Sequence, residues 1–142
     1  MVVVQAGRPA PVLHPLQAAL VAGIAPLFIG ALLCDLAYGS TAEPQWSNFA
    51  AWLLAGGMVY AGFALLWALI DLVRLRTTRG RAGLLALALL ALFVFGLVDC
   101  FVHARDAWAI MPDGPILSAV VAVLSLIALA LSLSLLRRER VA

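Results

Sequence analysis

The chain has 142 residues, of which 65% are hydrophobic and 11% charged, and its formal net charge is +2. A soluble domain averages about 25% charged residues, so this composition excludes an ordinary water-soluble globular domain. All nine basic residues are arginines. Cys34 and Cys100 lie within apolar runs, which argues against a disulfide framework of the small secreted type. We expect a single transmembrane domain over residues 1–142.

Four apolar segments are long enough to cross a bilayer core, which needs about 20 helical residues. In chain order they cover residues 16–38, 48–74, 82–103 and 115–137. Pro15 and Pro115 stand in the first turns of the first and fourth segments, where a missing N–H costs nothing, and Ser47 or Asn48 can cap the second. Lipid offers no partner for an open backbone, so the segments must be helices. The first run exceeds a signal-peptide core of about 7–15 residues, and we expect that helix to be retained. The sequence predicts an all-α, four-helix transmembrane bundle.

The arginines predict the orientation. With four crossings, eight of them fall on one side of the membrane: Arg8, Arg74, Arg76, Arg79, Arg81, Arg137, Arg138 and Arg140. Arg105 alone falls on the other side. The positive-inside rule then makes both termini cytoplasmic, with outer loops at about 39–47 and 104–114. Tyr38, Trp46, Trp52 and Trp108 lie at the outer boundary, as in an aromatic belt. We expect a multi-pass protein of the plasma membrane, or of the inner membrane in a Gram-negative bacterium.

Small residues at helical spacing predict where the helices touch, because apolar helices in lipid associate through close packing. The three stripes are Ala18, Ala22, Pro26 and Gly30 in the first segment, Ala51, Ala55, Gly57 and Ala61 in the second, and Ser118, Ala122, Ser125 and Ser132 in the fourth. The serine hydroxyls in the stripe of the fourth segment can bond their own backbone.

Two stretches carry a family pattern: LHPLQAALVAGIAPLFIGALLCDLAY (13–38) and WSNFAAWLLAGGMVYAGFALLWALIDL (46–72). This pattern resembles the DUF2231 family of predicted four-helix membrane proteins. The features that carry it are His14–Pro15, the mid-span Pro26, the closing Asp35 and the HARDAW stretch (103–108) after the third segment. Many members have further histidines where this chain has Ala18–Ala19 and Ala82–Gly83, which argues against a role based on clustered histidines. The resemblance implies the fold and no established activity.

A candidate outer polar cluster contains Asp35, Asp99, His103 and Asp106. The last three share one helix face, and Asp35 should lie at similar depth if the first and third helices are neighbours. Ionisable groups inside a membrane are costly and are functional candidates by default. Three interpretations stay open. The cluster can help the chain leave the lipid, with His103 bonding Asp99 and Arg105 pairing with Asp106. It can hold a metal, with Cys34, Cys100 and His103 as the candidate ligands. It can also transfer protons or serve a redox partner such as a quinone.

A candidate inner polar cluster contains His14, Asp71 and Arg74. Asp71 and Arg74 are three residues apart on one helix face, a spacing that allows an ion pair; the alternative is a cytoplasmic proton or anion port. His14 and His103 are the two histidines of the chain, and they fall at opposite membrane surfaces, about 30 Å apart. One haem cannot join them within a monomer.

The sequence contains no Gly-rich phosphate loop, nucleophile elbow or HExxH motif, which are the signatures of common enzyme sites. We expect a non-enzymatic integral membrane protein that acts as an assembly partner, anchor or subunit of a membrane complex. The alternatives are a redox or proton-transfer component that uses the outer cluster and an oligomeric transporter or channel. We expect the lipid bilayer as a partner, with other membrane subunits or a homo-oligomer as further partners, and we expect no nucleic acid. No cofactor is predicted, with haem or a metal as the alternatives.

Overall fold

Four long helices make up the described part of the chain. The structure, a computed structural model, describes residues 13–74, 79–105 and 109–139, with the backbone alone at 79, 81 and 137–139. The helices are α1 (Pro15–Thr41), α2 (Pro44–Arg74), α3 (Arg79–His103) and α4 (Asp113–Glu139). Each is long and apolar enough to cross a membrane. The prediction of an all-α protein with four transmembrane helices is therefore confirmed.

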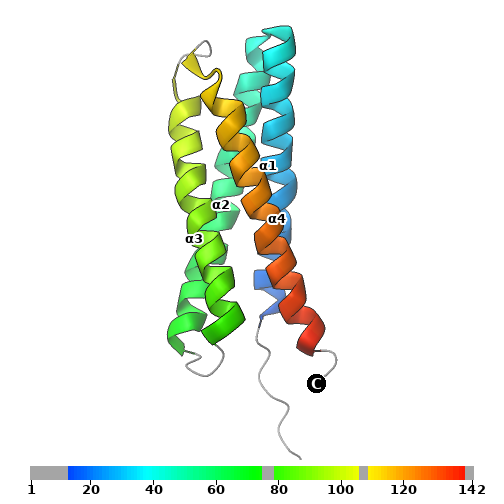
Figure 1. Cartoon of the computed structure of the whole chain (residues 1–142), viewed down its shortest axis with the longest axis vertical. Helices are drawn as coiled ribbons and strands as arrows, with labels where there is room; N and C mark the ends of the chain where they lie inside the picture. The colour runs from blue at the N-terminus through cyan, green and yellow to red at the C-terminus, as the bar shows by residue number, and fades with distance from the viewer. Residues whose placement is uncertain (1–12, 75–78, 106–108, 140–142) are drawn as a thin grey trace, which may run out of the picture.

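The helices form an up-and-down bundle in which α1 packs against α2 and α4, and α3 packs against the same two helices (Figure 1). As a result, α1 and α3 lie diagonally across the bundle. The described chain starts and ends at one end of the bundle, which we call the terminal end; the other is the opposite end (Figure 1). The cytoplasmic placement of the terminal end stays a prediction.

The turn between α1 and α2 is much shorter than the predicted outer loop at 39–47. It consists of Ala42 and Glu43, because α1 continues to Thr41 and α2 begins at Pro44. Ala42 adopts a left-handed conformation (φ 55°), and its N–H donates to the carbonyl oxygen of Tyr38 at 2.8 Å, which ends α1 in a recognised C-cap geometry. Capping of the second helix by Ser47 or Asn48 was a wrong prediction, since both lie inside α2.

The small-residue stripe predicted for α1 is also wrong in part. Ala22 and Pro26 are exposed, and Ala18 and Gly30 are only half-buried. The buried face instead carries larger side chains: Gln17, Val21, Ile24, Ala25, Phe28, Ala31, Asp35 and Tyr38. The reason is that the partner helix supplies the space. A Cβ at Gly57 of α2 would lie 3.0–3.3 Å from the Phe28 ring.

The small-residue stripes predicted for α2 and α4 agree better with the observed burial than the stripe of α1 does. Gly57 and Ala61 are buried, whereas Ala51 is half-buried and Ala55 exposed. All four members of the α4 stripe are buried: Ser118, Ala122, Ser125 and Ser132. Small residues on these two helices therefore face the bundle, as association in lipid requires.

Two of the aromatic residues predicted to form a belt are exposed at the opposite end. Trp52 is 78% exposed and Trp46 is 38% exposed, which is how belt residues meet the membrane–water interface. Tyr38 is buried and belongs to the core instead. Trp108 lies outside the described residues.

Candidate functional site

A polar cluster lies inside the opposite end of the bundle, and we call it the buried cluster. Its members are Asp35 near the end of α1, Asp99 and His103 in the last turns of α3, and Ser118 in the first turns of α4. His103 Nε2 lies 2.9 Å from Asp35 Oδ1. Ser118 Oγ lies 2.5 Å from Asp35 Oδ2 and 3.1 Å from Asp99 Oδ2. Three of the four helices therefore meet through side-chain hydrogen bonds.

The contact between Asp35 and His103 arises from a different arrangement than the one predicted. The sequence placed them together on the condition that the first and third helices are neighbours, but α1 and α3 are diagonal. The two side chains meet because both point toward the bundle axis at the same depth. Asp35 is 1% exposed and Asp99 is fully buried.

Ser118 was missed as a member of this cluster. The sequence showed it only as one of three serines in the small-residue stripe whose hydroxyls could bond their own helix. Ser125 does this, since its Oγ donates to the carbonyl oxygen of Ala122 at 2.7 Å. Ser118 instead bonds two carboxyl groups on other helices. No spacing in the sequence distinguishes the two serines; depth relative to Asp35 and Asp99 does.

The hydrogen bonds of the buried cluster indicate how many protons satisfy all of its contacts. His103 Nδ1 lies 3.0 Å from the Asp99 carbonyl oxygen, so this nitrogen carries a proton and donates it. The Nε2 contact to Asp35 needs a proton on one partner or the other. Ser118 contacts two carboxyl groups but has only one hydroxyl proton. The second hydrogen bond therefore needs a proton on one of these carboxyl groups.

The cluster is consequently neutral when all of these contacts are satisfied. A neutral His103 imidazole has one ring proton and Ser118 has one hydroxyl proton, and the contacts need two protons more. These two protons balance the carboxylate charges of Asp35 and Asp99. Neutrality fits the location, because an unbalanced charge in a low-dielectric interior is very costly. One acceptor atom of the cluster is left without a hydrogen bond. Asp99 Oδ1 lies 3.1 Å from His103 Nδ1, but that N–H points to the backbone oxygen, and Oδ1 has no hydrogen bond among the described residues.

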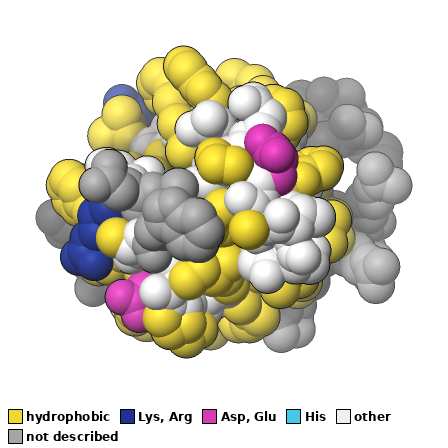
Figure 2. Space-filling model, turned by 90° about the horizontal axis from the view of Figure 1, so that it is seen from above, with side chains coloured by type: hydrophobic (Ala, Val, Ile, Leu, Met, Phe, Trp, Pro, Cys, Tyr) yellow, Lys and Arg dark blue, Asp and Glu magenta, His cyan; other side chains and the backbone are white. Residues whose placement is uncertain are grey.

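The side chains of the buried cluster are shielded from the surface at this end. Among the described atoms of the opposite end, Figure 2 shows mainly hydrophobic and uncharged groups, with acidic side chains at two places and basic side chains toward one edge. The side chains of His103 and Asp35 are each 1% exposed. The cluster is thus closed to the medium by the packed helices, and a reactant at the surface does not touch it in this conformation.

The two cysteines of the predicted outer site do not join the cluster. Cys34 and Cys100 are half-buried free thiols, and among the described residues no group of three His, Cys, Asp or Glu side chains is arranged to hold a metal ion. Nε2 of His103, the nitrogen a metal would use, already contacts Asp35. Asp106 lies outside the described residues, so its predicted pairing with Arg105 has no structural description.

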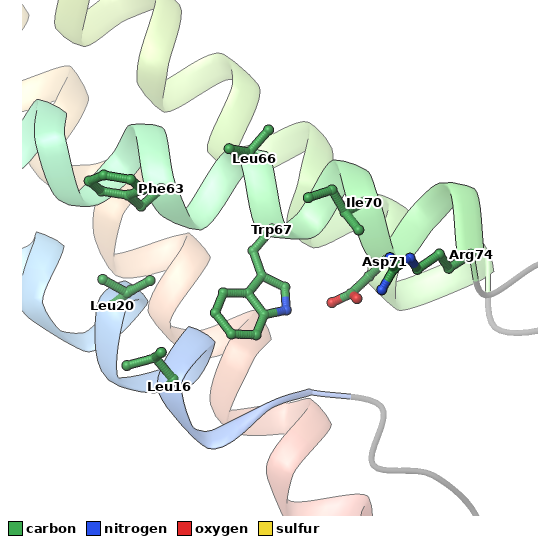
Figure 3. A pocket seen from close by; sticks show the side chains of 8 residues that line it. All are labelled: Leu16, Leu20, Phe63, Leu66, Trp67, Ile70, Asp71 and Arg74. Carbon is green, nitrogen blue, oxygen red and sulfur yellow. The ribbon is translucent and has the colours of Figure 1, made fainter.

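The inner candidates gather at the terminal end, around a groove between α1 and α2. We call it the terminal groove; its volume is about 540 Å³, and it is lined by Leu16, Leu20, Phe63, Leu66, Trp67, Ile70, Asp71 and Arg74 (Figure 3). His14 caps α1 by accepting a hydrogen bond from the Leu16 N–H at 3.2 Å, and its ring stacks on Trp67 with centroids 5.0 Å apart. The ion pairs that the described residues form within 4.0 Å both involve His103, so Asp71 and Arg74 share the groove without the predicted direct ion pair.

Gln17 is a second residue that the sequence reasoning missed. It is 1% exposed, and its Oε1 has no hydrogen-bond partner among the described residues. It lines a cavity of about 10 Å³ together with Leu13, Ala68, Asp71, Ala82, Leu85 and Leu135. That is roughly the space of one water molecule. A glutamine in the first turn of a transmembrane helix was the available signal.

His14 and His103 lie at opposite ends of the bundle, in the cap of α1 and the last turn of α3. One haem therefore cannot be ligated by both histidines within a monomer.

Comparison with known proteins gives one match. The model of the family DUF2231, described as a predicted membrane protein, matches residues 12–141. No curated protein and no solved structure matches the chain.

Proposed function

We propose a non-enzymatic role in the membrane for this chain, which belongs to the DUF2231 family of predicted membrane proteins. In this role it is a multi-pass subunit or anchor on which other polypeptides, or further copies of the chain, assemble. The distribution of arginines favours the plasma membrane, or the inner membrane in a Gram-negative bacterium.

The observation that carries the proposal is the closure of the buried cluster. Asp35, Asp99 and Ser118 are each at most 1% exposed, so the groups capable of acid–base chemistry contact each other rather than a bound substrate. Active-site groups typically line a concave pocket that a ligand can enter. The 540 Å³ terminal groove is at the other end of the molecule and is lined by none of these three residues; the carboxyl group on its wall is that of Asp71.

In this proposal the buried cluster holds the helices in register. Polar side chains that bond across transmembrane helices contribute about 0.6 kcal/mol each on average. They also penalise a wrong register, because a shifted helix leaves buried carboxyl groups unpaired. Asp35, His103 and Ser118 come from three different helices, so one shifted helix disrupts several contacts at once.

The test combines spectroscopy with cross-linking in intact membranes. The purified full chain should show no Soret band and no stoichiometric metal. A photo-activatable residue at position 123, where Val123 is 56% exposed, should cross-link to a defined partner or a second copy. The matched control is position 121, where Val121 is fully buried and should give no intermolecular product. A Soret band, stoichiometric metal, or no intermolecular product from exposed positions on any of the four helices would contradict the proposal.

A proton-transfer component is the second candidate, and the proton count of the buried cluster favours it. Two protons are shared among His103, Asp35 and Asp99, and they can be distributed in more than one way at zero net charge. Infrared spectroscopy separates the candidates. If the cluster transfers protons, a carboxylic-acid band responds to a change of pH and is lost in Asp99→Asn. If the cluster is structural, that band stays constant between mildly acidic and mildly alkaline buffer.

A further inference from the structure

The terminal groove has the size and the walls of a lipid-binding site. Its volume of about 540 Å³ lies within the range of small-molecule sites, about 300–1,000 Å³. Leu16, Phe63 and Leu66 on its walls are 53%, 60% and 55% exposed. Because α1 and α2 both cross the membrane, these side chains meet the acyl chains of the surrounding bilayer. The groove is therefore open to lipid along its side.

The polar groups are confined to one end of the groove. Asp71 and Arg74 are in the last turn of α2, and Figure 3 shows both beyond Trp67 toward the end of the helix. The nitrogen-bearing edge of the Trp67 indole is on the side nearer Asp71 (Figure 3). A tryptophan between apolar side chains and charged groups is typical of the depth at which lipid headgroups lie. The groove is thus apolar at chain depth and polar at headgroup depth.

The charges at this end are a carboxylate and a guanidinium that do not form a direct ion pair with each other. Arg74 keeps its donors for a phosphate, to which guanidinium groups bind well. Asp71 keeps its acceptors for a cation. Its place at the C-terminal end of α2 strengthens this preference, because the helix dipole there is negative.

We propose that the terminal groove binds one glycerophospholipid whose headgroup carries both a phosphate and a primary ammonium, the phosphatidylethanolamine class. Arg74 binds the phosphate, Asp71 accepts hydrogen bonds from the ammonium, and an acyl chain lies along Leu16, Leu20 and Phe63.

The presence of both a carboxylate (Asp71) and a guanidinium (Arg74) also discriminates between lipids. A phosphatidylglycerol phosphate is attracted by Arg74 and repelled by Asp71, and it brings no cation to balance the carboxylate. A choline headgroup carries a positive charge but no N–H donor for Asp71. An ethanolamine headgroup matches both charges. The terminal groove is at the terminal end and the buried cluster is at the opposite end, so the lipid site does not depend on the proposed function.

Native mass spectrometry of the full chain tests the proposal. The protein in detergent is mixed with equimolar phosphatidylethanolamine, phosphatidylcholine and phosphatidylglycerol, all with identical acyl chains. Ethanolamine lipid should bind about fivefold more tightly than either competitor, the size of one solvent-exposed ion pair. Binding should saturate at one lipid per chain. A preference for phosphatidylglycerol, or equal binding of the three lipids, would overturn the proposal.

Variants assign the two headgroup contacts. Asp71→Asn should abolish the preference for ethanolamine over choline lipid and increase phosphatidylglycerol binding, because the repulsion is gone. Arg74→Gln should weaken all three lipids. Asp113→Asn, at an exposed carboxyl group at the start of α4, is the matched control and should leave the preference unchanged. An unaltered preference in Asp71→Asn would overturn the assignment of the ammonium.

A groove-filling variant tests the location. Leu66→Trp should weaken the binding of all three lipids, whereas Leu133→Trp, at a 46% exposed leucine of α4, should not. Tryptophan fluorescence and size-exclusion chromatography establish that each variant is folded. If Leu66→Trp leaves lipid binding intact but disrupts a dimer, a second copy of the chain covers the groove and the lipid proposal is wrong.

Discussion

Replacing Ser118 by alanine isolates the contribution of the buried cluster to stability. The variant removes one buried hydroxyl and two interhelical contacts, to Asp35 at 2.5 Å and to Asp99 at 3.1 Å. Interhelical hydrogen bonds in membrane proteins contribute about 0.6 kcal/mol on average and about 1.7 kcal/mol at most. We therefore expect Ser118→Ala to lower the free energy of unfolding by about 1–3 kcal/mol.

The matched control is Ser125→Ala on the same helix. Ser125 is also fully buried, but its hydroxyl donates to Ala122 within α4. Such bonds to the preceding turn do not stabilise helices, and alanine is the better helix former. Both variants delete the same atoms and leave voids of similar size, so the difference between them measures the interhelical contacts. We expect Ser125→Ala to be neutral or slightly stabilising.

The assay is reversible unfolding in mixed detergent micelles, followed by tryptophan fluorescence. Equal losses in the two variants would refute the reasoning, because they would show that the carboxyl contacts of Ser118 add nothing to a buried serine. A double-mutant cycle with Asp35→Asn adds a second criterion. Residues in direct contact show coupling energies of about 0.5–3 kcal/mol, and a coupling near zero would also contradict the interpretation.

Two further predictions use the same unfolding assay, and a third concerns the orientation of the chain in the membrane. Asp99→Asn should fold, because an amide keeps an acceptor and supplies donors to its neighbours. Asp99→Leu should be less stable, because the Ser118 hydroxyl loses its contact with the Asp99 carboxyl group; equal stability of both variants would count against the cluster. Gly57→Ala should lower the free energy of unfolding by about 1–3 kcal/mol, because the new Cβ would lie 3.0–3.3 Å from the fully buried Phe28 ring. The control Gly83→Ala should not, because no atom lies within 4 Å of its new Cβ. A stabilising Gly57→Ala would show that the ring moves aside. Tags fused to the two ends of the chain should both be protected from an external protease in intact cells, and cleavage of either tag would refute the predicted orientation.

Part of the fold could be predicted from the sequence because lipid imposes strict conditions on a polypeptide. Long apolar runs such as 48–74 must be helical in a membrane, and their number and order followed directly. Positions of helix ends were less secure. Prolines such as Pro44 permit a helix to begin earlier than a capping residue suggests, which is why α2 starts before Ser47. The orientation of the bundle in the membrane comes from the arginines alone and stays a prediction.

The candidate site was only partly readable in the sequence. Asp35, Asp99 and His103 were noticed because charged residues are rare inside spans, whereas Ser118 and Gln17 were missed because serine and glutamine in apolar helices give a weaker signal. The burial of Asp35 against His103 depends on which helices are diagonal, and hydrophobic periodicity carries no information about that.

What the sequence by itself determined is the solvent of this protein and the number of times the chain crosses it, since hydropathy and length are local properties of each segment. Only the tertiary structure decided that Asp35, Asp99, His103 and Ser118 share one closed cluster and that Asp71 and Arg74 line one groove. The physical reason is that both arrangements depend on the relative rotation and depth of separate helices. These are set by side-chain packing between helices, such as Phe28 against Gly57, and not by the composition of any one of them.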